Sequence, residues 1–121
     1  MNTGAEDKLG TLKISDDVIA VCTTNAVLKT KGVAGLSGGF SDNFPKNILG
    51  KEPLYKGIKV SQNDDGISID VFIIVEYGVK IPEVAWNIQE NVKKEVEHIT
   101  ESTVKAVNIH VQGVHFTDEE D

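Results

Sequence analysis

Two histidines near the C-terminal end of the chain have the side-chain type best suited to metal binding. His110 and His115 lie in a strand-like run, and a bulge at Gly113 would bring them and Gln112 to one face of that strand. Two imidazoles on one face can ligate a transition metal, but a zinc site needs further ligands and no third one is adjacent in sequence. We therefore predict surface histidines and no metal site.

A glycine-rich segment, residues 37–55, offers a second possible chemistry. A phosphate-binding loop requires Gly, four residues, Gly-Lys and then Ser or Thr. Here Gly50-Lys51 is followed by Glu52, and Pro45 occupies the position of the first glycine. The pattern fails, so the glycines indicate turns and no cofactor is predicted.

The remaining reactive side chains do not form a recognisable catalytic set. Asp64-Asp65 lacks the other ligands of a calcium loop and fits a hairpin turn. Cys22 has apolar neighbours and is predicted to be a buried thiol; as the single cysteine it fits a reducing compartment. The three histidines lie apart in sequence, and no nucleophile–base pair is apparent. We predict no catalytic residues and no enzyme activity.

Composition and charge narrow the classes of partner. The formal net charge is −7 and the isoelectric point is about 4.9, which disfavours nucleic acid and anionic lipid. No apolar run approaches the roughly 20 residues of a membrane span, and the N-terminal residues lack the features of a signal peptide. We expect no nucleic-acid partner, no direct membrane insertion and a cytoplasmic location.

The elements that position these side chains are organised around a strand–helix–strand unit. The pattern predicts a strand over residues 67–78, a helix from about Glu83 to Thr100, and a strand over residues 104–116. Val107, Ile109 and Val111 share one parity, and Val114 and Phe116 have the other. The predicted bulge at Gly113 would bring all five to the core side.

The rest of the chain completes an α+β prediction. Short strands are predicted at Leu12–Ile14, Val33–Leu36 and Ile58–Ser61, and a helix capped by Ser15 is predicted to run to about Thr30. The prediction is a two-layer fold with a mixed sheet of about five strands and two helices on one face; helices on opposite faces are the alternative. Residues 1–9 are expected to be a disordered N-terminus, 10–116 one domain, and 117–121 an acidic tail.

Five side chains are predicted to form interaction surfaces. Phe72 and Ile74 are apolar at the centre of the sheet face that the helices would leave open, and we expect self-association there or coverage by residues 37–55. Trp86 lies on the charged side of its helix, where a partner would anchor on it or another part of the chain would cover it. Phe40 and Phe44 are candidates for a ligand lid.

Four segments carry a family resemblance: LKISDDVIA (residues 12–20), VEYG (75–78), KIPEVAWNIQ (80–89) and VNIHVQGV (107–114). With them the chain resembles the alkaline shock protein family of Gram-positive bacteria, in its short single-domain branch. The resemblance covers about residues 10–116. It implies a link to cell-envelope stress, no assigned catalytic activity, and work through protein partners such as a membrane anchor or acetyl-CoA carboxylase.

The resemblance favours a non-enzymatic interaction or scaffold protein of envelope stress and lipid homeostasis, with protein partners or a homo-oligomer. The alternative is a small-ligand or regulatory binding domain that acts on a neighbouring metabolic enzyme, with Phe40 and Phe44 in its lid. A saturable thermal shift with acyl or nucleotide ligands would favour this alternative.

Overall fold

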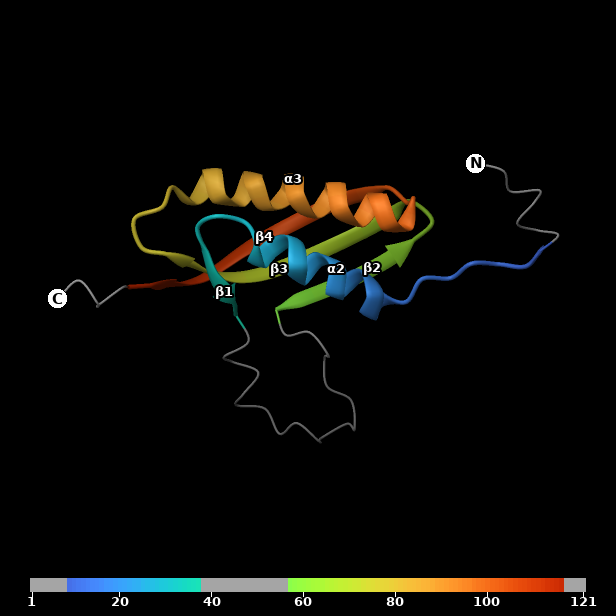
Figure 1. The fold of residues 1–121 in the computed structure, drawn as a ribbon, viewed down its shortest axis with the longest axis horizontal. Helices are drawn as coiled ribbons and strands as arrows, with labels where there is room; N and C mark the ends of the chain where they lie inside the picture. Colours follow the sequence, from blue (N-terminus) through green and yellow to red (C-terminus); the bar gives the residue numbers. More distant parts are fainter. Residues whose placement is uncertain (1–8, 38–56, 117–121) are drawn as a thin grey trace, which may run out of the picture.

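The computed structural model describes residues 9–37 and 57–116. Within these ranges the chain forms two helices and four strands in an α+β arrangement (Figure 1). Their order is α2 (Asp16–Leu28), β1 (Val33–Leu36), β2 (Ile58–Asn63), β3 (Gly66–Glu76), α3 (Ile81–Thr100) and β4 (Val104–His115). Phe40, Phe44, the acidic tail and residues 1–8 lie outside the described ranges.

The sheet is mixed, as predicted, and β3 is its central strand. β1 and β2 both pair with it antiparallel and follow one another along the same edge, with β2 against residues 66–71 and β1 against residues 73–75. β4 pairs in parallel along the opposite edge. The strand–helix–strand unit therefore places β3 and β4 side by side (Figure 1).

The predicted strand at Leu12–Ile14 is wrong, so the described sheet has four strands and not five. Leu12 is 76% exposed, and the segment has no ladder partner among the described residues. Instead the Gln62 side chain of β2 donates from Nε2 to the carbonyl of Ile14 (3.0 Å) and to Oδ1 of Asp16 (2.7 Å). A two-residue apolar alternation is too short to specify backbone pairing, and a side chain secures the segment instead.

Both helices pack on one face of the sheet, which confirms the prediction and excludes the arrangement with helices on opposite faces (Figure 1). Every second residue of β3 is fully or almost fully buried under them: Ile67, Ile69, Val71, Ile73 and Val75. The facing stripe of α3 is Val84, Ile88, Val92 and Val96. Ile19, Ala26 and Val27 of α2 complete this core.

The ends of the helices follow the local sequence. The Ser15 hydroxyl accepts from the backbone N–H of Val18 (3.3 Å) and caps α2, with Asp16 and Asp17 in the first turn. Pro82 lies in the first turn of α3. That helix ends at Glu101, which has φ +58° in the left-handed region.

The predicted bulge in β4 is present. The register shifts between Ile73 and Ile74 of β3, leaving Gln112 as the extra residue, and Gly113 pairs with Ile74. Val114 returns to the helix side opposite Val75, as predicted. However, Val114 is 41% and Phe116 is 60% exposed, so the prediction that both reach the core is wrong. β4 runs clear of α3 at this end, and no described helix covers them (Figure 1).

Candidate functional site

The sheet surface opposite the helices, here called the open face, carries the candidate site. On β3 it presents the second set of alternating residues, all of which are half-buried: Ser68, Asp70, Phe72, Ile74 and Glu76. β4 contributes Asn108, His110 and His115 beside them, and β2 contributes Lys59 and Ser61. No described helix covers this surface (Figure 1).

An aromatic stack lies at the centre of the open face. The rings of Phe72 and His110 lie 4.3 Å apart between centroids and 11° from parallel. Nε2 of His110 is 3.0 Å from Oδ1 of Asp70, and the same oxygen accepts from the Asn108 amide (3.2 Å). The Lys59 ammonium lies 5.9 Å from the Phe72 centroid, within range of a cation–π contact. The Phe72 ring is therefore surrounded by polar side chains whose positions are fixed by contacts with it or with each other.

Ile74 continues this apolar centre between two glycines. It pairs with Gly35 on β1 and with Gly113 on β4. A Cβ built on Gly113 would lie 3.2 Å from Cδ1 of Ile74, so the isoleucine side chain leans over β4. The prediction places Phe72 and Ile74 on the uncovered face, and the structure brings them together there with His110, which the sequence predicts only as a surface histidine.

The segment that contains Phe40 and Phe44 leaves and returns beside Phe72. The Phe72 N–H donates to the carbonyl of Gly57 (2.8 Å), and its carbonyl accepts from the Ser37 N–H (2.7 Å). Coverage of the open face by this segment, and its role as a lid, remain predictions.

Trp86 lies on α3 with 60% of its surface exposed. Its predicted position on the charged side of the helix is therefore correct, and within residues 9–37 and 57–116 nothing buries the indole. At the same end of the molecule Tyr77 and Phe116 stack, with centroids 4.6 Å apart and an interplanar angle of 28°. Sequence analysis missed this pair because it assigned Phe116 to the core side of its strand, whereas the ring lies against Tyr77.

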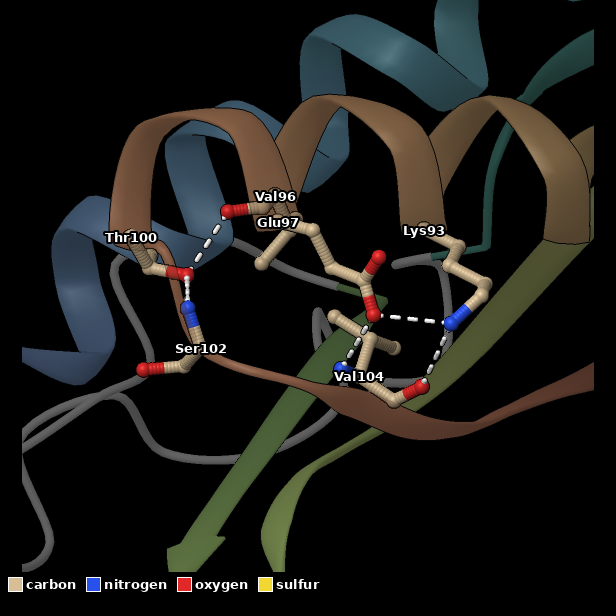
Figure 2. A network of polar contacts seen from close by, with 6 residues as sticks. All are labelled: Lys93, Val96, Glu97, Thr100, Ser102 and Val104. Atoms are coloured by element: carbon tan, nitrogen blue, oxygen red, sulfur yellow. Dashed lines mark hydrogen bonds and ion pairs between the residues drawn. The ribbon is translucent and has the colours of Figure 1, made fainter. Parts of the chain in front are cut away.

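A polar network near the C-terminal end of α3 was also missed (Figure 2). Oε2 of Glu97 accepts from the Lys93 ammonium (2.7 Å) and from the Val104 N–H (2.8 Å), and Lys93 also donates to the Val104 carbonyl (3.3 Å). The hydrogen bond from Lys93, and then that from Val104, lower the pKa of the Glu97 carboxyl. The helical pattern assigns both side chains to a solvated face, whereas they bind the start of β4.

Neither metal binding nor nucleophilic chemistry gains support from this geometry. In the described parts of the chain, no group of three or more His, Cys, Asp or Glu side chains could hold a metal ion. His115 instead meets Glu76, with Nδ1 3.2 Å from Oε1. Cys22 is half-buried and not fully buried as predicted, and this partial burial raises the pKa of its thiol, which disfavours the thiolate. The open face is suited to contact rather than to covalent chemistry.

The family model of alkaline shock protein 23, described by its cell envelope-related function, matches residues 4–116. The chain belongs to the alkaline shock protein family. This confirms the predicted resemblance, and a relative named as a stress response regulator gls24 homolog from Streptococcus pyogenes is 28% identical over 87% of this chain and 59% of its own length.

Other relatives in the comparison match along most or nearly all of their length. The uncharacterized protein YloU of Bacillus subtilis is 40% identical over 97% of this chain and 98% of its own. Spy1614 of S. pyogenes is 40% identical over 94% and 95%, and YqhY of B. subtilis is 38% identical over 89% and 79%. None of these names is that of an enzyme.

A structural likeness extends the fold beyond the alkaline shock protein family. The solved structure of MamM-CTD superposes with a TM-score of 0.50 at 13% identity, covering 82% of this chain and 99% of that one. At this identity the likeness concerns the fold alone. Among the described helices, none combines the length and the apolar character needed to cross a membrane.

Proposed function

We propose that this protein is a non-enzymatic interaction or scaffold protein of the envelope stress response and lipid homeostasis, and that it acts in the cytoplasm of a Gram-positive bacterium. The observation that carries the proposal is the open face, where Phe72 and Ile74 form an apolar centre that no described element covers. The family's cell envelope-related description and the stress-response name of a relative support the context.

The chemistry of the open face suits a protein partner. An apolar centre with a polar rim is the usual anatomy of a protein interface. Here Phe72 supplies the apolar contact, while Asp70, Lys59 and Glu76 provide charges of both signs around it. Trp86 supplies a second exposed aromatic side chain, of the type enriched at binding hot spots.

The test uses two variants that add the same charge to the same face. Phe72→Asp places a carboxylate at the apolar centre, and Ser61→Asp places one on exposed β2 away from it. Each is expressed in a deletion strain and crosslinked with and without cell-wall stress. We expect wild type and Ser61→Asp to capture the same proteins and restore stress tolerance, and Phe72→Asp, still folded by circular dichroism, to do neither. Equal capture and tolerance with both variants would overturn the proposal.

The alternative, a regulatory ligand-binding domain, depends on Phe40 and Phe44 and stays a prediction. Thermal shift with acyl and nucleotide ligands tests it directly. A saturable shift that is lost in a Phe40→Ala, Phe44→Ala variant would favour it.

A further inference from the structure

The outer edge of β4 is guarded by side chains along only its first half. Val104 is held at both its N–H and its carbonyl by Glu97 and Lys93 (Figure 2), and Nε2 of Gln89 donates to the Val107 carbonyl (3.0 Å). These three residues of α3 occupy the place of a neighbouring strand. Such side-chain cover is one way in which proteins protect a sheet edge.

Beyond Val107 this protection stops. The Val107 carbonyl points away from β3, and backbone groups two residues apart point the same way, so those of Ile109 and Val111 also point outward. No residue in the described ranges makes a hydrogen bond with them on this side. Trp86 lies three residues before Gln89 and therefore on the same side of α3, at the point where the guarding ends.

The side chains along this edge also become more exposed toward the C-terminal end of β4. On the helix side of β4, exposure rises from 4% at Val104 and 8% at Val107 to 41% at Val114. Ile109 and Val111 lie between these values and are half-buried, although Val71 and Ile73, with which they pair, are fully buried. Figure 1 shows the cause, since β4 runs clear of α3 toward its C-terminal end.

The edge also lacks the residues that normally prevent strand pairing. Exposed edges usually carry charges, especially Lys, or proline. No residue from Ala106 to Phe116 is Lys, Arg, Asp, Glu or Pro, although 26% of the chain is charged. A strand that pairs here contacts backbone groups and β-branched side chains. This part of β4 carries no formal charge that would oppose the pairing.

We propose that β4 edges of two copies of this chain pair antiparallel about a two-fold axis at His110. Ile109 then lies opposite Val111 of the partner subunit, and the outward groups of both copies make about four hydrogen bonds. His110 lies opposite His110 of the partner subunit, as a non-hydrogen-bonded pair on the open face. The β-branched residues face each other on the helix side, where such pairs stabilise a sheet.

Two observations favour a second copy over an unrelated peptide. The two outward residues flank His110 symmetrically, so one short segment provides both halves of the pair. The net charge of −7 opposes self-association in general, whereas residues 106–116 of the chain carry no formal charge and so add no charge repulsion of their own when two copies meet. Gln112 begins the bulge and ends the pairing segment identically in both copies.

Disulfide trapping tests the register. In a Cys22→Ser background, His110→Cys places two thiols across a non-hydrogen-bonded pair, where Cα atoms lie about 4.5 Å apart, a separation that a disulfide spans. We expect a covalent dimer on mild oxidation. Lys59→Cys, exposed on the same face at the opposite edge, is the control; it should pair through β4 as the wild type does but form no covalent dimer. Equal crosslinking of both variants, or none of either, would overturn the proposal.

A charge pair tests the interface in solution. Asn108 and Gln112 are both exposed and lie opposite each other across the proposed axis. Asn108→Lys with Gln112→Lys sets like charges against each other and should give a monomer by sedimentation. Asn108→Lys with Gln112→Glu sets opposite charges together and should restore the dimer.

The Phe72→Asp variant is expected to stay dimeric. Loss of partner binding through the open face is therefore distinguishable from loss of dimerisation through the β4 edge. A monomeric wild type at its highest soluble concentration would overturn the proposal and leave the edge to a partner's strand or to residues 38–56. A double-lysine variant that still dimerises would place the interface elsewhere.

Discussion

At the residue scale, the structure shows specific contacts for side chains whose types alone suggested only solvent exposure. Glu97 and Lys93 have the spacing of an ordinary helical ion pair, yet both bind the backbone of Val104. His110 lies between Asp70 and Phe72, so its imidazole is oriented rather than free in solvent.

The Glu97 carboxylate should make a small, pH-dependent contribution to stability. Its folded-state pKa lies below the usual value of 4.5 because Lys93 and Val104 donate to the charged form. The contribution is therefore present above about pH 4.5 and lost as the pH falls through the folded pKa. Because the pair is solvent-exposed, we expect Glu97→Gln to cost at most about 1 kcal/mol at pH 7.

Urea unfolding of wild type and Glu97→Gln at pH 7 and near pH 3 measures this. The difference between the two proteins should shrink in acid, with Glu90→Gln as the control on the same helix. A difference that is unchanged between the two pH values would contradict the assignment.

Substitution of Gly113 should act through Ile74. Gly113 is not among the glycines with positive φ, so a side chain placed there would not be strained by a left-handed backbone. A Cβ there would lie 3.2 Å from Cδ1 of Ile74, and we expect Gly113→Val to destabilise the fold by about 1–3 kcal/mol, as overpacking does.

A double-mutant cycle with Ile74→Ala checks this cause. The cost of Gly113→Val should fall when the contacting methyl is absent. An unchanged cost would point to the backbone of the bulge and not to the side-chain contact.

At the scale of elements, the sequence patterns predicted what depends on long periodic runs. The stripe of α3, the alternation of β3 and the change of parity in β4 each specify a face, and the structure confirms all three. The false strand at Leu12–Ile14 shows the limit, because two apolar residues cannot specify a partner. The guarding of β4 by Glu97 was also unpredictable, since it depends on how α3 crosses a strand that follows it in sequence.

The C-terminal end of α3 offers a stabilising substitution. Glu101 adopts φ +58° and ψ +23°, a left-handed conformation that favours glycine. Glu101→Gly should raise the free energy of unfolding by about 0.5–1 kcal/mol. Glu101→Ala, measured in the same thermal or urea unfolding experiment, separates loss of the side chain from relief of the backbone. A Gly variant no more stable than the Ala variant would show that the conformation costs little.

Trp86 should be dispensable for folding. With 60% of its surface exposed, Trp86→Ala is expected to cost less than about 1 kcal/mol, whereas Ile88→Ala, two residues away and fully buried, should cost about 2–5 kcal/mol.

Fluorescence adds an independent readout, since Trp86 is the single tryptophan. Emission from the isolated protein should be red-shifted and readily quenched, and partner binding should shift it to the blue. Blue-shifted emission of the monomer, together with a large cost of Trp86→Ala, would mean that the indole is a core residue.

At the scale of the whole molecule, the two edges of the sheet are not equivalent. The β4 edge is one continuous strand, while the opposite edge is divided between β1 and β2 at Phe72. A two-fold pair through β4 joins the continuous edges of the two copies. The free edges of the joined sheet are then the two edges that are divided between β1 and β2. Such an assembly closes at two copies, because an isologous contact uses the same surface on both.

The division of that edge has a consequence for how much the chain tolerates change in length. One residue, Phe72, binds both Ser37 and Gly57, so the ends of segment 38–56 are fixed close together whatever lies between them. The free-energy cost of closing a loop varies slowly with length, by about 0.6 kcal/mol per doubling. We therefore expect a short Gly-Ser linker in place of residues 38–56 to leave the unfolding midpoint nearly unchanged. The site between β1 and β2 is therefore a position at which we expect this chain to accept insertions and deletions while the six described elements stay folded.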